Sequence, residues 1–154
     1  MPLNRDFVGR EYPADAAYEV STEVIRQFAQ ALGETNPACY DAAAAAALGY
    51  PGVVAPPTFL TVLSHRFAQA SPLVDPQLGL DYSLVVHGEQ RFEAHRPVVA
   101  GDVLSATSRV ADVRAAGRNE MITLVTEVAD SQGARVATLT ATLVSRGTAT
   151  GERS

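Results

Sequence analysis

The stretch Ala55–Ala70, APPTFLTVLSHRFAQA, decides the fold because it predicts an apolar helix that must be buried. Pro57 suits the first position of a helix, where no backbone donor is needed. Apolar side chains then recur at intervals of three and four residues, which predicts a helix packed deep in the protein rather than laid on its surface. This apolar stripe comprises Phe59, Leu60, Val62, Leu63, Phe67 and Ala70.

Two further helices are predicted upstream of this stretch. Ser21 is a good N-cap and Gly33 supplies a left-handed stop, so we expect a helix between them. Its apolar face comprises Val24, Ile25, Phe28, Ala31 and Leu32. Asp41 can cap a second, short helix of alanines that Gly49 ends, because Ala has the highest helix propensity. The first half of the chain is therefore predicted to be helical.

The second half of the chain changes to a period of two, which is typical of strands. The segment 135–146, RVATLTATLVSR, alternates Ala or Leu with Thr, as expected for a sheet with one buried face. Similar strands are predicted over 82–96, Val103–Val113 and Met121–Ala129, joined by turns at VAGD, AAGRNE and DSQGA. Gly88 interrupts the first of these strands and predicts a bulge or a close backbone approach.

Together these elements predict an α+β fold with a single domain, in which an antiparallel sheet wraps a long buried helix. A chain of 154 residues is large enough to bury one such core. We place the domain at residues 1–146 and expect a flexible C-terminal tail at 147–154, because the tail has nothing to bury.

The composition is that of an ordinary globular protein, with 47% hydrophobic and 19% charged residues. One cysteine excludes a disulfide within the chain and favours a reducing compartment. The first ten residues contain charge where a signal peptide needs an apolar run, and no segment has the apolar length of a membrane span. We therefore expect a cytoplasmic protein that does not interact with membranes.

The net charge of −5 argues against nucleic acid as a partner, because nucleic-acid binding needs clustered Lys and Arg. All twelve basic residues are Arg, and Lys is absent. A GC-rich codon bias is the simplest interpretation of this composition. The alternative is that some of the Arg side chains bind a phosphate through two parallel hydrogen bonds, which Lys does less well.

Four segments occur in a specific order along the chain: FVGREYP, GETNPACYD, VVAPPTFL and VVHGEQRFEAHRPVVAGDVL. In this order they resemble the MaoC-like family of acyl-thioester dehydratases and hydratases, which have the hot-dog fold. The chain is similar to the FAS1-type dehydratase N-terminal branch, which includes the smaller, non-catalytic subunits of mycobacterial (3R)-hydroxyacyl-ACP dehydratases. The resemblance implies a sheet wrapped around a central helix, an acyl-CoA or acyl-ACP substrate, and no metal or other cofactor.

Catalytic members of this family carry an Asp, an Asn-Pro pair and a His after the first helix. Matched residue by residue, these positions hold Glu34, Asn36-Pro37 and Cys39. A His pKa of about 6.5 suits proton transfer near neutral pH, whereas the pKa of Cys is about 8.5. The longer Glu34 side chain also displaces its carboxylate, and a misplacement of this kind can lower a rate about 100-fold. The resemblance therefore implies that Glu34 and Cys39 form a degenerate catalytic pair.

The start of the central helix departs from the family pattern as well. The preceding loop usually ends in His-Gly, but here it ends in Pro56-Pro57. Pro57 removes one backbone donor, although the N–H of Thr58 remains to hold a carbonyl oxygen. By this resemblance we predict substrate contacts from Asn36, Pro57, Thr58 and Phe59.

Several of these residues also have a structural interpretation. Asn36 with the following proline makes a good turn in any protein, and Glu34 also fits a solvated loop charge. Cys39 is more typical of an inert buried thiol than of a nucleophile. His65 is expected to be structural, and His95 alternates with apolar residues and is expected to face solvent.

His87 and Glu89 are weaker catalytic candidates on a predicted strand. Residues two apart share one face of a strand, and a carboxylate beside an imidazole is an arrangement used in acid–base sites. The simpler interpretation, which we favour, is a strand histidine that makes one hydrogen bond.

The leading functional hypothesis is a component of an acyl-thioester dehydratase or hydratase that lines the acyl tunnel, has little activity alone and works with a catalytic MaoC-like chain. The alternatives are a homodimeric hydratase using His87 and Glu89, a thioesterase with Glu34 as base, and an acyl-binding module without turnover. In each case we expect two hot-dogs side by side, as a homodimer or a heterodimer, because a lone sheet leaves an unpaired edge. An acidic acyl carrier protein would require a local Arg patch, for which the candidates are Arg91, Arg96 and Arg146.

Overall fold

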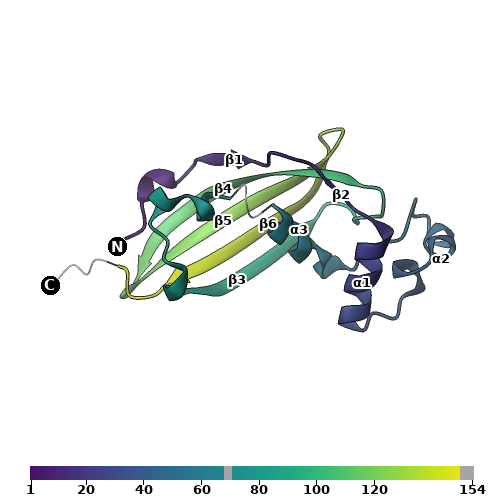
Figure 1. Cartoon of the computed structure of the whole chain (residues 1–154), viewed down its shortest axis with the longest axis horizontal. Helices are drawn as coiled ribbons and strands as arrows, with labels where there is room; N and C mark the ends of the chain where they lie inside the picture. Colours follow the sequence, from purple (N-terminus) through teal and green to yellow (C-terminus); the bar gives the residue numbers. More distant parts are fainter. Residues whose placement is uncertain (68–70, 150–154) are drawn as a thin grey trace.

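The computed structural model describes residues 1–67 and 71–149, and these residues form an α+β fold built on one antiparallel sheet (Figure 1). The sheet has six strands in the order β1-β4-β5-β6-β3, and β2 also pairs with β4. The predicted fold class is confirmed. The strands are β1 (Glu11–Pro13), β2 (Tyr18–Glu19), β3 (Val85–Ala94), β4 (Val103–Ala116), β5 (Asn119–Asp130) and β6 (Arg135–Ser145).

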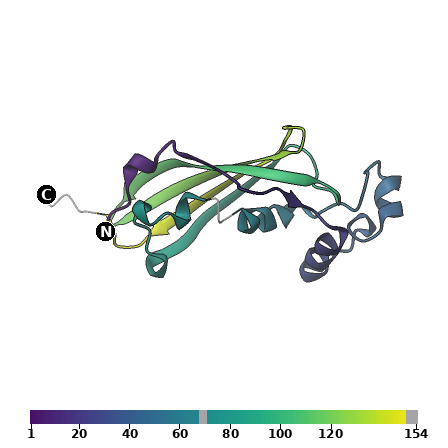
Figure 2. The same cartoon turned by 45° about the horizontal axis from the view of Figure 1, so that its top comes forward.

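The helices are α1 (Thr22–Leu32), α2 (Ala42–Ala47) and α3 (Leu60–Arg66). The caps predicted for the first two are confirmed: the hydroxyl of Ser21 accepts from the N–H of Val24, and Gly33 ends α1 with a φ of 69°. Asp41 caps α2 as predicted. Helices α1 and α2 lie beyond one end of the sheet (Figure 2), and none of the described helices is long and apolar enough to cross a membrane.

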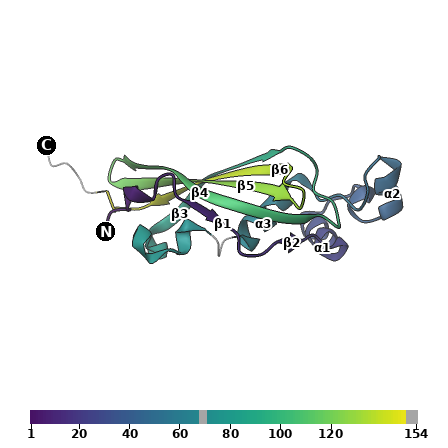
Figure 3. The same ribbon diagram turned by 90° about the horizontal axis from the view of Figure 1, so that it is seen from above.

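Short 3-10 helices lie before β1, between the three α-helices and between α3 and β3, and α3 lies against one face of the sheet (Figure 3). The opposite face carries no helix in the part of the chain that the structure describes. The 3-10 helices are η1 (Arg5–Phe7), η2 (Pro37–Cys39), η3 (Pro57–Phe59), η5 (Pro72–Val74), η6 (Pro76–Leu78) and η7 (Tyr82–Leu84).

The central helix is shorter than the sequence predicts. Its first residues form η3, and α3 ends at Arg66 with Phe67 as its C-cap, while Ala70 lies outside the described residues. Two side chains in α3 bind carbonyls of the preceding turn: Ser64 Oγ donates to Leu60 O at 3.5 Å, and His65 Nδ1 donates to the carbonyl four residues before it at 2.8 Å. Such bonds weaken a helix because they compete for its carbonyls. As a result, α3 covers only part of the inner sheet face.

The buried apolar residues of the described part of the chain form two clusters. The helix-side cluster packs α3 and η3 against one end of the sheet and includes Phe59, Leu63, Leu104, Val128, Val136 and Leu139. The turn-side cluster packs the N-terminal segment and η6 against the other end and includes Phe7, Leu78, Val110, Ile122, Leu124 and Leu143.

Strand β3 is an edge strand with a bulge. In the part of the chain that the structure describes it pairs only with β6, and the register shifts between His87 and Glu89. A Cβ at Gly88 would lie 3.2 Å from Val144 Cγ2 and 3.3 Å from the carbonyl of Thr142. The predicted bulge and close approach at this glycine are therefore confirmed.

The C-terminal boundary at residue 146 stays a prediction. Just beyond it, Gly147 N donates to the side chain of Asn119 at 3.0 Å, Thr148 is buried, and Ala149 N donates to the carbonyl of Arg118 at 3.2 Å. The remainder of the predicted tail, 150–154, lies outside the described residues.

Candidate active site and a second cavity

A cavity of about 420 Å³ lies where the segment after α1 meets η3 and the end of β3. We call it the site cavity, and among the residues that line it are Glu34, Asn36, Cys39, Pro57, Phe59 and His95. The structure thus brings together residues as far apart in the sequence as Glu34 and Val98 at one end of the sheet.

Glu34 follows the left-handed stop of α1, and its carboxylate folds back on the chain. Its Oε1 accepts hydrogen bonds from the N–H groups of Thr35 at 2.8 Å and Asn36 at 2.9 Å. The carbonyl of Glu34 accepts from the hydroxyl of Tyr40 at 2.6 Å. The residue therefore closes its own loop as well as facing the cavity.

Asn36 has a similar double position. Its Oδ1 accepts from the N–H of Ala38 at 3.1 Å and so caps η2, whose first residue is Pro37. This is the turn role that Asn-Pro favours. Asn36 also lines the site cavity, so both of its interpretations from the sequence fit its location.

Cys39 is the buried member of the group, with 4% of its surface exposed. Burial raises the pKa of its thiol above the ordinary value, and the negative charge of Glu34 raises this pKa further. The thiol is therefore protonated at neutral pH and cannot accept a proton as an imidazole does.

The η3 residues form the neighbouring wall of the cavity. Phe59 is fully buried, and its ring meets the edge of Phe28 with centroids 5.6 Å apart. Pro57 lines the cavity from the first position of η3, and Thr58 lies exposed beside it. Of the four predicted substrate contacts, Asn36, Pro57 and Phe59 thus line the site cavity, whereas Thr58 is placed next to it.

His95 lines the site cavity, although the sequence predicted only that it faces solvent. Its side chain is exposed, and Nε2 lies 3.0 Å from Thr138 Oγ1. Because the Thr138 hydroxyl donates its proton to Glu127 Oε2 at 2.8 Å, it accepts from His95 Nε2, and Nδ1 takes no part in this series. One feature of the sequence could have indicated this location: His95 comes at the end of a predicted strand, directly before Arg96-Pro97.

Arg96 stabilises the segment after β3, which contains His95 and forms one wall of the site cavity. Its guanidinium donates two hydrogen bonds to Asp102, at 2.8 and 3.0 Å, and contacts Asp130 at 3.4 Å. The hydrogen bonds with Asp102 raise the pKa of Arg96. Asp102 also accepts from the N–H of Val99 at 2.9 Å, and the adjoining Val98 carbonyl accepts from Ala55 N at 2.8 Å.

The three arginines suggested for carrier-protein docking all have partners within the chain. Arg96 is paired as described, and Arg91 lies 3.6 Å from Glu93. Arg146 Nε donates to the carbonyl of Leu84 at 3.2 Å. An Arg patch at these positions stays a prediction.

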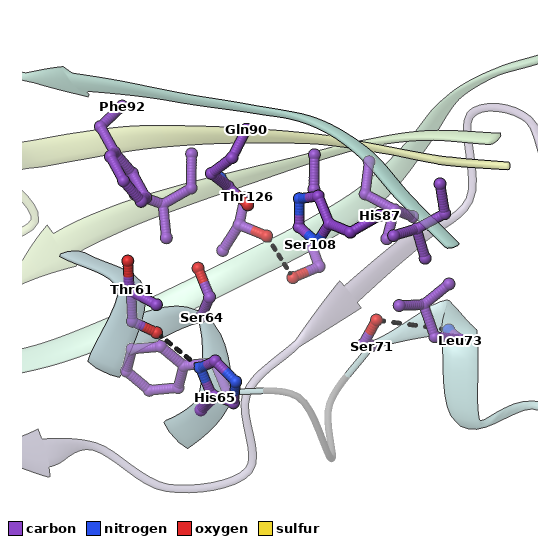
Figure 4. Close-up of a pocket in the computed structure, with 15 residues that line it drawn as sticks. Thr61, Ser64, His65, Ser71, Leu73, His87, Gln90, Phe92, Ser108 and Thr126 are labelled. Carbon is purple, nitrogen blue, oxygen red and sulfur yellow. Dashed lines mark hydrogen bonds between the residues drawn. The ribbon is translucent and has the colours of Figure 1, made fainter. Parts of the chain in front are cut away.

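A second cavity, of about 530 Å³, lies between α3 and the inner sheet face (Figure 4). We call it the tail cavity, and its lining includes His65, Phe67, His87, Phe92, Leu124 and Leu143. His87 Nε2 donates to the main-chain carbonyl of Glu89 at 3.0 Å, rather than to its carboxylate. His87 thus makes a local bond across the Gly88 bulge, as its simpler interpretation expects; Glu89 is exposed, and a catalytic role for the two residues stays a prediction.

Comparison with known proteins gives consistent matches over most of the chain. A model of the FAS1-like, dehydratase domain region matches residues 6–139. A UPF0336 protein of Parafrankia sp. is 54% identical over 149 residues, which are 97% of this chain and 98% of that protein. A UPF0336 protein of Streptomyces coelicolor is 50% identical over 147 residues, or 95% and 97% of the two chains.

Solved structures with the same architecture include two that exceed 25% sequence identity. The HadBC (3R-hydroxyacyl-ACP dehydratase) complex from Mycobacterium tuberculosis superposes with a TM-score of 0.80 at 30% identity, over 92% of this chain and 99% of that chain. A MaoC-like dehydratase superposes with a TM-score of 0.78 at 36% identity, over 91% of this chain but only 42% of that longer chain.

Proposed function

Because the chain belongs to the family of FAS1-like dehydratase domain regions, we propose that it is the acyl-chain-binding component of a hot-dog dehydratase or hydratase. In this role it binds the acyl part of a CoA or carrier-protein thioester. A second, MaoC-like hot-dog chain supplies the carboxylate and imidazole that move protons at the α- and β-carbons.

One observation carries this proposal: the residues at the family's catalytic positions face a cavity but are poorly suited to proton transfer. The Cys39 thiol has a raised pKa and is protonated at neutral pH. The Glu34 carboxylate is held by two N–H groups of its own loop. General acid–base catalysis is most efficient when the pKa of the catalytic group lies near the working pH, which the thiol does not satisfy.

The tail cavity supports the acyl-binding part of the role. It is mostly apolar, lies under the short α3, and has the volume range of small-molecule sites. An acyl chain entering beside η3 would replace the packing that a longer central helix would provide. The shortened helix therefore favours a chain that accommodates the acyl tail.

The free edge of β3 supports pairing with a second hot-dog. The outer edge of this ten-residue strand has no partner among the described residues, and its C-terminal end carries Ala94 and His95 into the site cavity wall. A strand that pairs there would place residues of the second chain beside the site. HadBC was solved as a complex, and the similar MaoC-like dehydratase chain is more than twice as long as the matched part.

The experiment is a hydration assay with trans-2-dodecenoyl-CoA, followed by the loss of enoyl absorbance. We expect little turnover by the purified chain alone. Co-expression with a MaoC-like chain that carries both Asp and His should yield a complex with turnover, and mutation of that chain's His should abolish it. Robust turnover by the purified chain alone would refute the division of labour.

A second candidate, an autonomous homodimeric enzyme, is favoured by the hydrogen-bond chain at His95. Glu127, Thr138 and His95 form a carboxylate–hydroxyl–imidazole series that uses Nε2 of His95 and does not involve Nδ1. If the chain alone hydrates the enoyl thioester, a His95→Gln variant should lose that activity. Release of free CoA from a saturated acyl-CoA, detected with a thiol reagent, would identify a thioesterase instead.

A further inference from the structure

The tail cavity contains more hydrogen-bonding groups than a plain hydrocarbon chain needs. Four polar residues on three strands of the inner sheet face, Ser108, Thr126, Gln90 and His87, line the cavity, and we call them the polar belt. The helix-side and turn-side clusters lie on either side of this belt. Figure 4 shows its members on the sheet side of the cavity, with Thr61, Ser64 and His65 of α3 across from them.

Ser108 and Thr126 form the centre of the belt. They are directly opposite each other on β4 and β5, and their hydroxyl oxygens are 2.8 Å apart. Two hydroxyl groups carry two protons, and the bond between them uses only one. Ser108 is 5% exposed, and both residues line the cavity, so the second proton can be donated at a place from which bulk water is largely excluded. The pair therefore offers one donor to a ligand in the cavity.

The neighbouring members of the belt offer acceptors. Gln90 Nε2 donates to the carbonyl of Thr140 at 3.1 Å, which leaves its Oε1 to accept. His87 Nε2 donates to the carbonyl of Glu89, so the other ring nitrogen, Nδ1, is the one available to a ligand. The donor pair on β4 and β5 and the acceptors on β3 thus line the same cavity, with β6 between them in the sheet.

The uncharged lining of the cavity restricts the kind of chemical group that can bind there. Its described lining contains no Asp, Glu, Lys or Arg. A charged substituent would therefore lose its hydration without gaining a partner of opposite charge. A neutral group that both donates and accepts satisfies the belt.

We propose that the tail cavity selects an acyl chain that carries a hydroxyl group at the depth of the polar belt, an inference that rests on the proposed acyl-binding role. The hydroxyl accepts from the Ser108–Thr126 pair and donates to Gln90 or His87. A methylene at the same depth leaves the second proton of the Ser108–Thr126 pair without a partner, which is unfavourable because Ser108 is buried. The substrate class is an oxygenated acyl thioester rather than a simple saturated one.

The test is isothermal titration calorimetry of the full chain with dodecanoyl-CoA and with its monohydroxylated isomers, one for each carbon beyond the β-carbon. We expect one isomer, or two adjacent ones, to bind about tenfold more tightly than dodecanoyl-CoA, as two added hydrogen bonds allow. The remaining isomers should bind more weakly than dodecanoyl-CoA, because they bury a hydroxyl without a partner.

A double variant assigns the preference to the belt. Ser108→Ala with Thr126→Val removes both hydroxyls together, so no buried partner is left unpaired, and it should abolish the preference. Thr140→Val is the matched control, because it makes the same substitution on β6 at a residue outside the cavity lining, and it should keep the preference. Thermal unfolding establishes that each variant is folded.

The possible failures are distinguishable. If dodecanoyl-CoA binds as tightly as every isomer, the hydroxyl selection is wrong while the acyl-binding role stands. If the preference survives in the double variant, the polar belt does not cause it. If no thioester binds at all, both the inference and the proposed acyl-binding role are overturned.

Discussion

Removal of the Asp102 carboxylate should destabilise the protein and loosen one wall of the site cavity. Asp102 is 13% exposed and binds the guanidinium of Arg96, which is 32% exposed, through two short hydrogen bonds. It also accepts from the N–H of Val99, a buried residue. An Asp102→Ala substitution removes all three bonds at once and leaves a charged guanidinium partly buried.

The magnitude follows from these contacts. Loss of a partly exposed charge-assisted pair contributes about 1–2 kcal/mol, and an unsatisfied backbone N–H about 1 kcal/mol. The expected total is about 2–3 kcal/mol, or a decrease in Tm of about 5–10 °C for a domain of this size. Asp102→Asn keeps an acceptor for the N–H and for one guanidinium bond, so it should lose about half as much.

The assay is urea unfolding followed by circular dichroism, with Asp112→Ala as the matched control. Asp112 pairs with Arg114 at 3.6 Å, but both side chains are more than half exposed, and such pairs contribute less than about 1 kcal/mol. If Asp102→Ala unfolds at the same urea concentration as the wild type, the network does not hold the loop in place. Equal effects of the two substitutions would also contradict the reasoning.

Three further predictions concern the site and the bulge. The double variant Glu34→Asp/Cys39→His should gain measurable hydration of trans-2-dodecenoyl-CoA by the chain alone; no gain would mean that the cavity lacks the family's catalytic geometry. Burial and the charge of Glu34 raise the pKa of Cys39, so its alkylation by iodoacetamide should be slow at neutral pH. The alkylation rate should rise only at a pH above that at which free cysteine reacts, and a rate equal to that of free cysteine would contradict the burial. Gly88→Ala should lower the free energy of unfolding by about 1–3 kcal/mol, because the new Cβ would press on the backbone of β6. Gly133→Ala is the control for the separate cost of a positive φ, because a Cβ at Gly133 would have no atom within 4 Å.

The sequence predicts the local features of this fold well because their signals are local. The caps of α1 and α2 depend on single residues, Ser21, Gly33 and Asp41, within one turn of the helix they bound. Strands β3 to β6 follow from alternation along each segment, whereas the short β1 and β2 lie in the half predicted to be helical and were missed. The bulge at Gly88 also follows from one residue whose missing side chain admits the neighbouring strand.

The length of the central helix could not be predicted in the same way. Its apolar stripe continues in sequence to Ala70, but Ser64 and His65 compete for the carbonyls that the helix needs. This competition depends on side-chain conformations that an apolar period does not reveal. The tail cavity, which depends on where α3 ends, was therefore beyond the sequence pattern.

In the candidate site too, residues close together in the sequence could be predicted, and a residue brought in by the fold could not. Glu34, Asn36 and Cys39 are close in sequence, so a family resemblance is enough to group them. His95 reaches the same cavity only because β3 pairs with β6 up to Ala94 and so brings the residue that follows the strand to that end of the sheet. Alternation alone assigned His95 to solvent, since an exposed face and a cavity rim look the same in a period of two.

The tail cavity gives a physical reason why the proposed acyl-binding subunit would keep a short central helix. A longer central helix would join the helix-side and turn-side clusters and bury more apolar surface, which would stabilise the chain by about 25 cal/mol for each Å² buried. The structure instead leaves a space of about 530 Å³ between them, bordered by hydroxyl, amide and imidazole groups. Empty volume of this kind lowers stability unless a ligand occupies it. A bound acyl chain would recover that loss and link ligand binding to folding, so a tight acyl ligand should raise the Tm of the chain itself, with or without a catalytic partner.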